Sequence, residues 1–148
     1  IANATEGGAV LGGLDETTVE ALRTYGYSLG MAFQIVDDIL DYTGDEELMG
    51  KPVGSDLLEG TVTLPGLLFL ERYPRNNPIK RFFTARRERH LRLQEAIGAI
   101  LASDVIEASM DIARDYIRRA NAALDVLPAS DAKDCLADLG EYVLNRRS

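Results

Sequence analysis

The sequence predicts an all-α protein, and three observations carry this prediction. Apolar residues recur at the three- and four-residue spacing of amphipathic helices, and no stretch of useful length alternates as a strand would. Helix-capping residues, glycines and prolines separate these periodic stretches. The 148 residues, 46% of them hydrophobic, are enough to bury the core of one domain. We therefore expect residues 1–148 to form a single all-helical domain.

Each expected helix follows from its own start and stop signals. In chain order, helices are expected at about residues 1–11, 16–42, 64–72, 79–84, 88–102, 104–127 and 131–146. Their expected N-terminal caps are, where the sequence offers one, Asp15, Thr63, Ser103 or Asp104, and Ser130. Gly12 and Gly13 end the first helix and Pro128 stops the sixth, while residues 43–56 have the composition of a turn or loop.

Composition excludes several classes of protein. The net charge of −8 and a pI near 4.6 argue against nucleic acid as the main partner, because a negative surface repels a phosphate backbone. No apolar run approaches the roughly 20 residues that span a bilayer, and no signal peptide is recognisable. The single cysteine, Cys135, excludes an internal disulfide and suits a reducing compartment. We expect a cytoplasmic protein, in which Cys135 packs inside a helix.

The most informative segment is Phe33-Gln-Ile-Val-Asp37-Asp38-Ile-Leu-Asp41. On a helix, Gln34, Asp37, Asp38 and Asp41 fall within an arc of about 100°. Like charges at this spacing repel, and the C-terminal end of a helix disfavours negative charge. A bound cation would relieve the repulsion within such a cluster, and Mg²⁺, which takes oxygen ligands, is the candidate. A solvated acidic face remains the alternative on spacing alone.

Three neighbouring features each allow two interpretations. Gly26 and Gly30 continue the stripe of Gln34 and either open a groove toward the acids or permit close helix packing. Lys51, in a stiffened Gly-Lys-Pro loop, either meets a phosphate bridged to the acids or is an exposed lysine. A basic cluster is expected to be a solvated, salt-bridged face, with a binding patch as the alternative; it comprises Arg86, Arg87, Arg89 and His90.

These motifs resemble those of the trans-isoprenyl diphosphate synthases. The resemblance rests on residues 30–41, on Gly50-Lys-Pro-Val-Gly-Ser-Asp56, and on Glu59-Gly60 with Thr63-Leu-Pro65. It covers residues 26–68 densely and identifies the acids as the family's second aspartate-rich motif. The resemblance implies the C-terminal half of an isoprenoid-synthase-type helical bundle. The family's first aspartate-rich motif would precede Ile1, and the chain begins inside a helical pattern without an initiator methionine.

The resemblance implies Mg²⁺-dependent elongation of an allylic diphosphate by isopentenyl diphosphate in a homodimeric parent enzyme. It implies that Asp37, Asp38 and Asp41 hold Mg²⁺, with Asp37 the first choice for direct coordination. Lys51 would hold diphosphate oxygen, and Gln34 would turn its carbonyl oxygen toward the allylic cation. The 148 residues alone are expected to be inactive, since the missing half would supply the second carboxylate cluster.

Two alternatives accompany this interpretation. The chain would otherwise be a non-catalytic helical subunit or remnant, or part of a terpene cyclase, although the Asp-Asp-x-x-Asp form argues against a cyclase. The sequence also departs from the family at Thr61, where many members carry a lysine that contacts diphosphate. The tail residues Arg146 and Arg147 either approach the homoallylic diphosphate or cap the last helix. Product length stays open, because the residues that set it would lie near the first motif.

Overall fold

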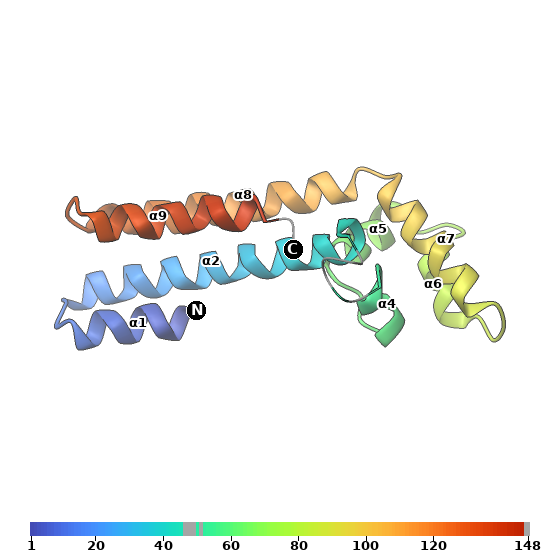
Figure 1. Ribbon diagram of the computed structural model, residues 1–148, viewed down its shortest axis with the longest axis horizontal. Coiled ribbons are helices and arrows are strands. Elements are labelled where there is room, and N and C mark those ends of the chain that lie inside the picture. Colours follow the sequence, from blue (N-terminus) through green and yellow to red (C-terminus); the bar gives the residue numbers. More distant parts are fainter. Residues whose placement is uncertain (46–49, 51, 147–148) are drawn as a thin grey trace. The chain divides into compact units, whose positions relative to one another are not determined.

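A computed structural model of the chain describes residues 1–45, 50 and 52–146. Throughout these residues the regular structure is helical, which confirms the all-α prediction (Figure 1). The α-helices are, in order, α1 (Ala2–Leu11), α2 (Glu16–Thr43), α4 (Ser55–Glu59), α5 (Leu64–Arg72), α6 (Pro78–Thr84), α7 (Arg89–Leu101), α8 (Val105–Ala123) and α9 (Asp131–Leu144), with a 3-10 turn, η1 (Leu124–Val126), after α8. Every helix expected from the sequence is present within a few residues of its expected bounds.

The predicted caps Asp15 and Ser130 are confirmed by side-chain hydrogen bonds, and Thr63 is confirmed in its N-cap position alone. Asp15 Oδ1 accepts a hydrogen bond from Thr18 N at 2.9 Å, and Ser130 Oγ accepts one from Lys133 N at 3.2 Å. Thr63 occupies the N-cap position of α5, but its side chain makes no capping hydrogen bond. The sequence analysis missed Asn77, whose Oδ1 accepts from Ile79 N at 2.9 Å and so begins α6.

Helix α4 was not expected, because residues 43–56 were interpreted as a loop. Its five residues lie between Gly54 and Gly60, whose φ angles of 74° and 99° place both in the left-handed region. Glycine tolerates that region, so both ends of this short turn of helix are set by the backbone. A five-residue helix is also shorter than the window over which helical periodicity is detected.

The structure divides into two compact units, and the first comprises residues 1–36 and 111–146. Here α1 packs closely on α2, since a Cβ built at Gly26 would lie 2.9 Å from Ala2 Cα. Helix α9 packs as closely on α8 through Gly140, whose added Cβ would meet Ile117 Cγ2 at 2.8 Å. Tyr25 is buried and donates its hydroxyl to the Leu136 carbonyl at 2.8 Å, which ties α2 to α9.

The second unit, residues 37–110, holds the end of α2, helices α4 to α7 and the start of α8. Its hydrophobic core consists of the buried residues Tyr42, Leu57, Phe69, Ile79, Phe82, Leu93, Ala96, Ile100 and Val105. Arg72 Nη1 donates to Asp104 Oδ2 at 2.5 Å, a contact that joins the end of α5 to the residue before α8. The expectation of one domain over residues 1–148 stays a prediction.

Two further features bear on the sequence analysis. None of the helices in the described part of the chain is both long and apolar enough to cross a bilayer. Cys135 is exposed, so the expectation that it packs inside the protein was wrong. Helix α9 presents its buried face through Gly140 and Val143 instead.

Candidate functional site

Asp41 lies at the end of α2 and is fully buried. Its carboxylate accepts two hydrogen bonds: Oδ1 from Ser55 Oγ at 2.6 Å, and Oδ2 from Asp56 N at 3.2 Å. The Asp41 carbonyl also accepts from Gly54 N at 2.8 Å. A buried carboxylate is stable only when its oxygens are hydrogen-bonded, and the first turn of α4 provides the donors. Asp41 therefore holds the start of α4 against the end of α2.

Asp38 makes a comparable contact with the next helix. Its Oδ2 accepts from the backbone N–H of Leu64, the first residue of α5, at 3.4 Å. The first N–H groups of a helix have no partner within the helix, and the helix dipole favours negative charge there. Asp38 and Asp41 are thus each placed at the N-terminus of a following helix, which offsets their unfavourable place at the end of α2.

Gln34 is the most accessible of the predicted site residues on α2. Asp37 and Asp38 are partly exposed, and Gln34 is exposed. Phe33, next to Gln34, is 37% exposed and lies beneath the Arg146 guanidinium, 4.3 Å from the ring centroid. The tail residue Arg146 therefore contacts α2 one position before Gln34. Lys51 and Arg147, also considered from the sequence, lie outside the described residues.

Tyr42, next to Asp41 near the end of α2, is almost fully buried. Burial raises the pKa of Tyr42 to about 12, the Thr63 hydroxyl opposes the rise, and the carboxylates of Asp41, Asp56 and Asp38 add to it. Tyr42 Oη and Thr63 Oγ1 are close, but neither reaches hydrogen-bonding geometry with any described group. The Tyr42 phenol therefore stays protonated at physiological pH, among carboxylates.

The chemistry of this arrangement is that of a carboxylate surface. Within the described ranges, no three His, Cys, Asp or Glu side chains are gathered closely enough to enclose a metal ion. Asp41 turns both carboxylate oxygens toward Ser55 and Asp56, whereas Asp37 and Asp38 keep part of their surface accessible. Oxygen ligands suit a hard divalent cation, and Mg²⁺ normally keeps several waters beside one or two carboxylates. Asp37 and Asp38 fit that pattern.

The upstream glycines answer one question that the sequence left open. A Cβ at Gly26 would lie 2.1 Å from Thr5 Oγ1, so α1 occupies the space beside this glycine. At Gly30 the corresponding Cβ would meet Ile1 at 3.7 Å, an ordinary contact. Close helix packing at Gly26 is thereby confirmed, and α1 fills the proposed groove at that position.

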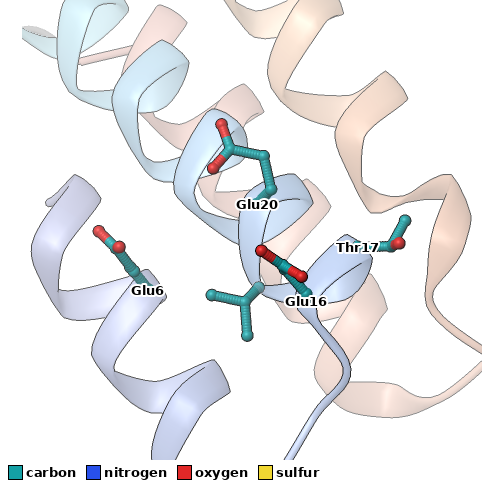
Figure 2. A pocket seen from close by; sticks show the side chains of 5 residues that line it. Glu6, Glu16, Thr17 and Glu20 are labelled. Carbon is teal, nitrogen blue, oxygen red and sulfur yellow. The ribbon is translucent and has the colours of Figure 1, made fainter.

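A second group of acids lies in the first unit, between α1 and the start of α2. Glu6, Glu16, Thr17 and Glu20 help to line a cleft of about 590 Å³. Figure 2 shows the three glutamates, Glu6 on α1 and Glu16 and Glu20 on α2. Arg23 accompanies them, its Nε 3.8 Å from Glu6 Oε2 and its Nη1 3.6 Å from Glu20 Oε2. These side chains are well exposed, and such pairs contribute little to stability.

Comparison with known proteins identifies the family. Residues 1–103 match the protein family described as Polyprenyl synthetase. The chain belongs to the polyprenyl synthetase family. It is 41% identical over 140 residues to heptaprenyl diphosphate synthase component 2 of Bacillus subtilis, a match that covers 95% of this chain and 40% of the relative. The resemblance stated from the acidic motif and its downstream loop is therefore confirmed.

Solved structures of polyprenyl synthetases share this fold. Heptaprenyl diphosphate synthase from Staphylococcus aureus superposes with a TM-score of 0.92 at 36% identity, covering 100% of this chain and 46% of that one. A polyprenyl synthase from Caulobacter crescentus, complexed with calcium and isoprenyl diphosphate, gives a TM-score of 0.89 at 40% identity, covering 99% and 45%. The chain thus spans less than half the length of these polyprenyl synthetases.

The sequence analysis did not predict which residues hold the acids at the end of α2 in place in this polyprenyl synthetase chain. Ser55 and Asp56 were noted as part of a motif, but their contacts with Asp41 were not expected. Tyr42 was assigned only to the end of the helix, although it is buried beside the acids. The signal available was Gly54-Ser55-Asp56, because a glycine followed by small polar residues often begins a helix.

Proposed function

We propose that the full protein to which this chain belongs elongates an allylic diphosphate with isopentenyl diphosphate in a Mg²⁺-dependent prenyl transfer. The observation that supports this most directly is the pair of partly exposed carboxylates, Asp37 and Asp38, beside a fully buried and hydrogen-bonded Asp41. This pair lies in the part of the chain that matches the polyprenyl synthetase family. The Caulobacter relative, complexed with calcium and isoprenyl diphosphate, gives the class of ligand.

In this proposal Asp37 and Asp38 hold Mg²⁺, with Asp37 the direct ligand. Bound Mg²⁺ would neutralise charge on the departing diphosphate and so lower the barrier to breaking the C–O bond. Asp41, proposed from the sequence as a third ligand, contributes by position, since its carboxylate is held by Ser55 and Asp56. One carboxylate oxygen of Asp38 already accepts a hydrogen bond from Leu64 N, so Asp38 coordinates Mg²⁺ partly through water.

Three more roles belong to the same proposal. Gln34, exposed and one helical turn before Asp37 and Asp38, directs its carbonyl oxygen at the developing allylic cation. Lys51 contacts the diphosphate. The part of the polyprenyl synthetase that this chain does not span supplies the opposing carboxylate cluster. A homodimer in the cytoplasm is the expected form of the whole enzyme.

The test is incorporation of radiolabelled isopentenyl diphosphate by the full-length protein, with an allylic diphosphate and Mg²⁺. Replacing a carboxylate that stabilises charge in the transition state costs about 10²-fold or more. We therefore expect Asp37→Ala to reduce turnover by at least that factor. Asp45→Ala, an exposed acid in the loop just after α2, is the matched control and should change turnover less than twofold.

Two outcomes contradict the proposal. Equal, small effects of Asp37→Ala and Asp45→Ala on turnover would show that Asp37 does not belong to the active site. Undiminished turnover after Mg²⁺ is chelated would remove the metal from the reaction. If the full-length protein folds but incorporates no label under any condition, the non-catalytic alternative replaces the proposal.

A further inference from the structure

Residues 78–92 form a strongly basic segment of an acidic protein. This segment, here called the basic hairpin, comprises α6, the connection 85–88 and the first turn of α7, and α6 and α7 pack against each other (Figure 1). It contains six Lys or Arg side chains and one acid, Glu88, so its net charge is +5 in a chain whose total is −8. The remainder of the chain therefore carries −13.

Intramolecular pairing neutralises only part of this charge. Glu95 lies 2.9 Å from Arg92 and 3.9 Å from Arg81, and Glu88 lies 3.9 Å from Arg92. Within the described part of the chain, Lys80, Arg86 and Arg87 enter no salt bridge, and all three are exposed. The salt bridges expected of the cluster Arg86, Arg87, Arg89 and His90 are instead made by Arg81 and Arg92, on either side of that cluster.

The same segment also carries exposed apolar side chains. Phe83 in the last turn of α6 is 42% exposed, and Leu91 in the first turn of α7 is 49% exposed. The hairpin is firmly held beneath them, because Ile79 and Phe82 are each only 1% exposed within the core of the second unit. Arg89 lies over the Phe82 ring at 4.9 Å and keeps its charge at the surface.

We propose that the basic hairpin docks on the surface of an anionic lipid bilayer. Clusters of four to eight Lys and Arg residues are attracted to anionic headgroups, and amphipathic helices add exposed Phe or Leu that enter the headgroup boundary. Lys80, Arg86, Arg87 and Arg89 supply the charge, and Phe83 and Leu91 supply the apolar contact. The acidic remainder does not prevent docking, since charges more than about 8 Å apart are largely screened at physiological salt.

Two other anionic partners fit the observations less well. Nucleic acid would contact the same cations. An exposed leucine, however, makes no favourable contact with a phosphate backbone, and the net charge of −8 repels a polyanion. The acidic surface of a second copy would complement the cations while leaving Phe83 and Leu91 unexplained. The proposal does not require the proposed prenyl transfer, because docking is measured without turnover.

The experiment is flotation of the full-length protein with vesicles of phosphatidylcholine alone or with about a third phosphatidylserine. Each surface cation contributes about 1 kcal/mol, a factor of about five, near an anionic bilayer. We expect binding only to the phosphatidylserine vesicles, with a loss of roughly thirtyfold in Arg86→Ala/Arg87→Ala. Phe83→Ser, which keeps every charge, should weaken binding severalfold, and raising the salt to about 0.5 M should release the protein.

The matched control is Arg118→Ala/Arg119→Ala, which removes the same charge from exposed positions on α8. It should leave vesicle binding within twofold. Equal losses in both double variants would show that net charge alone governs binding and would overturn the proposal. Absence of binding to phosphatidylserine vesicles would also overturn it. So would tighter binding to duplex DNA, or an oligomeric state that depends on Arg86 and Arg87 while vesicles stay unbound.

Discussion

Acidic residues four positions apart lie near both ends of α2, and their surroundings differ completely. Glu16 and Glu20 at the start border the open cleft of Figure 2, where Glu20 lies 3.6 Å from an exposed Arg23. Asp41 at the other end is fully buried and accepts hydrogen bonds from Ser55 and the backbone of α4. Identical spacing thus produces a solvated face in one place and an organised acidic site in the other.

The difference teaches what distinguishes the two kinds of acidic cluster. Long, exposed glutamates retain their hydration and need no counter-charge, so their pairs with arginine contribute at most about 1 kcal/mol. Short aspartates that lose part or all of their hydration need donors, and the starts of α4 and α5 supply backbone N–H groups for the buried Asp41 and the partly exposed Asp38. Backbone donors from the following helices, rather than spacing, mark the organised cluster.

The largest effect on stability is expected at Asp41. Asp41→Ala removes the acceptor for Ser55 Oγ and Asp56 N in a buried place, and hydrogen bonds to charged groups contribute about 1.5 to 3 kcal/mol each. We expect the free energy of unfolding to fall by about 3 kcal/mol, measured by urea denaturation of the full-length protein. Glu20→Ala is the control and should change it by less than about 0.5 kcal/mol. Similar losses in both variants would erase the distinction between the two ends of α2.

The second effect concerns the packing of the first half of α2. Gly26→Ala places a methyl group 2.9 Å from Ala2 Cα, and overpacking of this kind costs about 1 to 3 kcal/mol. Gly8→Ala in α1 meets nothing within 4 Å and should instead stabilise by about 0.5 to 1 kcal/mol, the helix-propensity gain of alanine over glycine. Thermal unfolding of the two variants measures both signs. If Gly26→Ala stabilised the protein, the interpretation of an open groove beside α2 would replace that of close helix packing.

Local signals were enough to predict every helix longer than five residues, and non-local contacts explain why the anchoring of the acids was missed. Apolar periodicity and caps such as Asp15 and Ser130 act within a few residues, so the order and bounds of the long helices followed directly. The acids were found because their charges share one stripe. Their anchoring depends on Ser55, 14 positions from Asp41, and on Leu64, 26 positions from Asp38, and no periodicity reports such pairings.

A smaller effect is expected where the tail meets the middle of α2. The Arg146 guanidinium lies 4.3 Å from the centre of the Phe33 ring, and cation–π contacts contribute about 0.5 to 2 kcal/mol. A double-mutant cycle with Arg146→Ala and Phe33→Leu should therefore give a coupling free energy of about 1 kcal/mol. Arg118→Ala with Phe33→Leu is the control cycle, for which we expect additivity within about 0.3 kcal/mol. Zero coupling between Arg146 and Phe33 would show that Arg146 does not contact α2 through this ring in solution.

The smallest effect at neutral pH is expected at Tyr42, where its pH dependence is the informative quantity. The Tyr42 hydroxyl is buried without a partner in the described structure, so Tyr42→Phe should change the free energy of unfolding by less than about 1 kcal/mol at pH 7. Tyr25→Phe, which loses the hydrogen bond to Leu136 O, should cost about 1 kcal/mol and serves as the matched comparison.

In alkali, replacing Tyr42 is expected to change the free energy of unfolding more than it does at pH 7. Burial raises the pKa of Tyr42 to about 12, whereas a tyrosine in the unfolded chain titrates near 10. The folded state therefore holds this proton more tightly, and the resulting stability is fully present below about pH 10 and is lost as the pH rises toward 12. Tyr42→Phe should flatten the fall in stability across that window, measured by urea denaturation at pH 9 to 11.5. An unchanged slope would mean that water reaches Tyr42 and its neighbour Asp41, and the contrast between the two ends of α2 would then be lost.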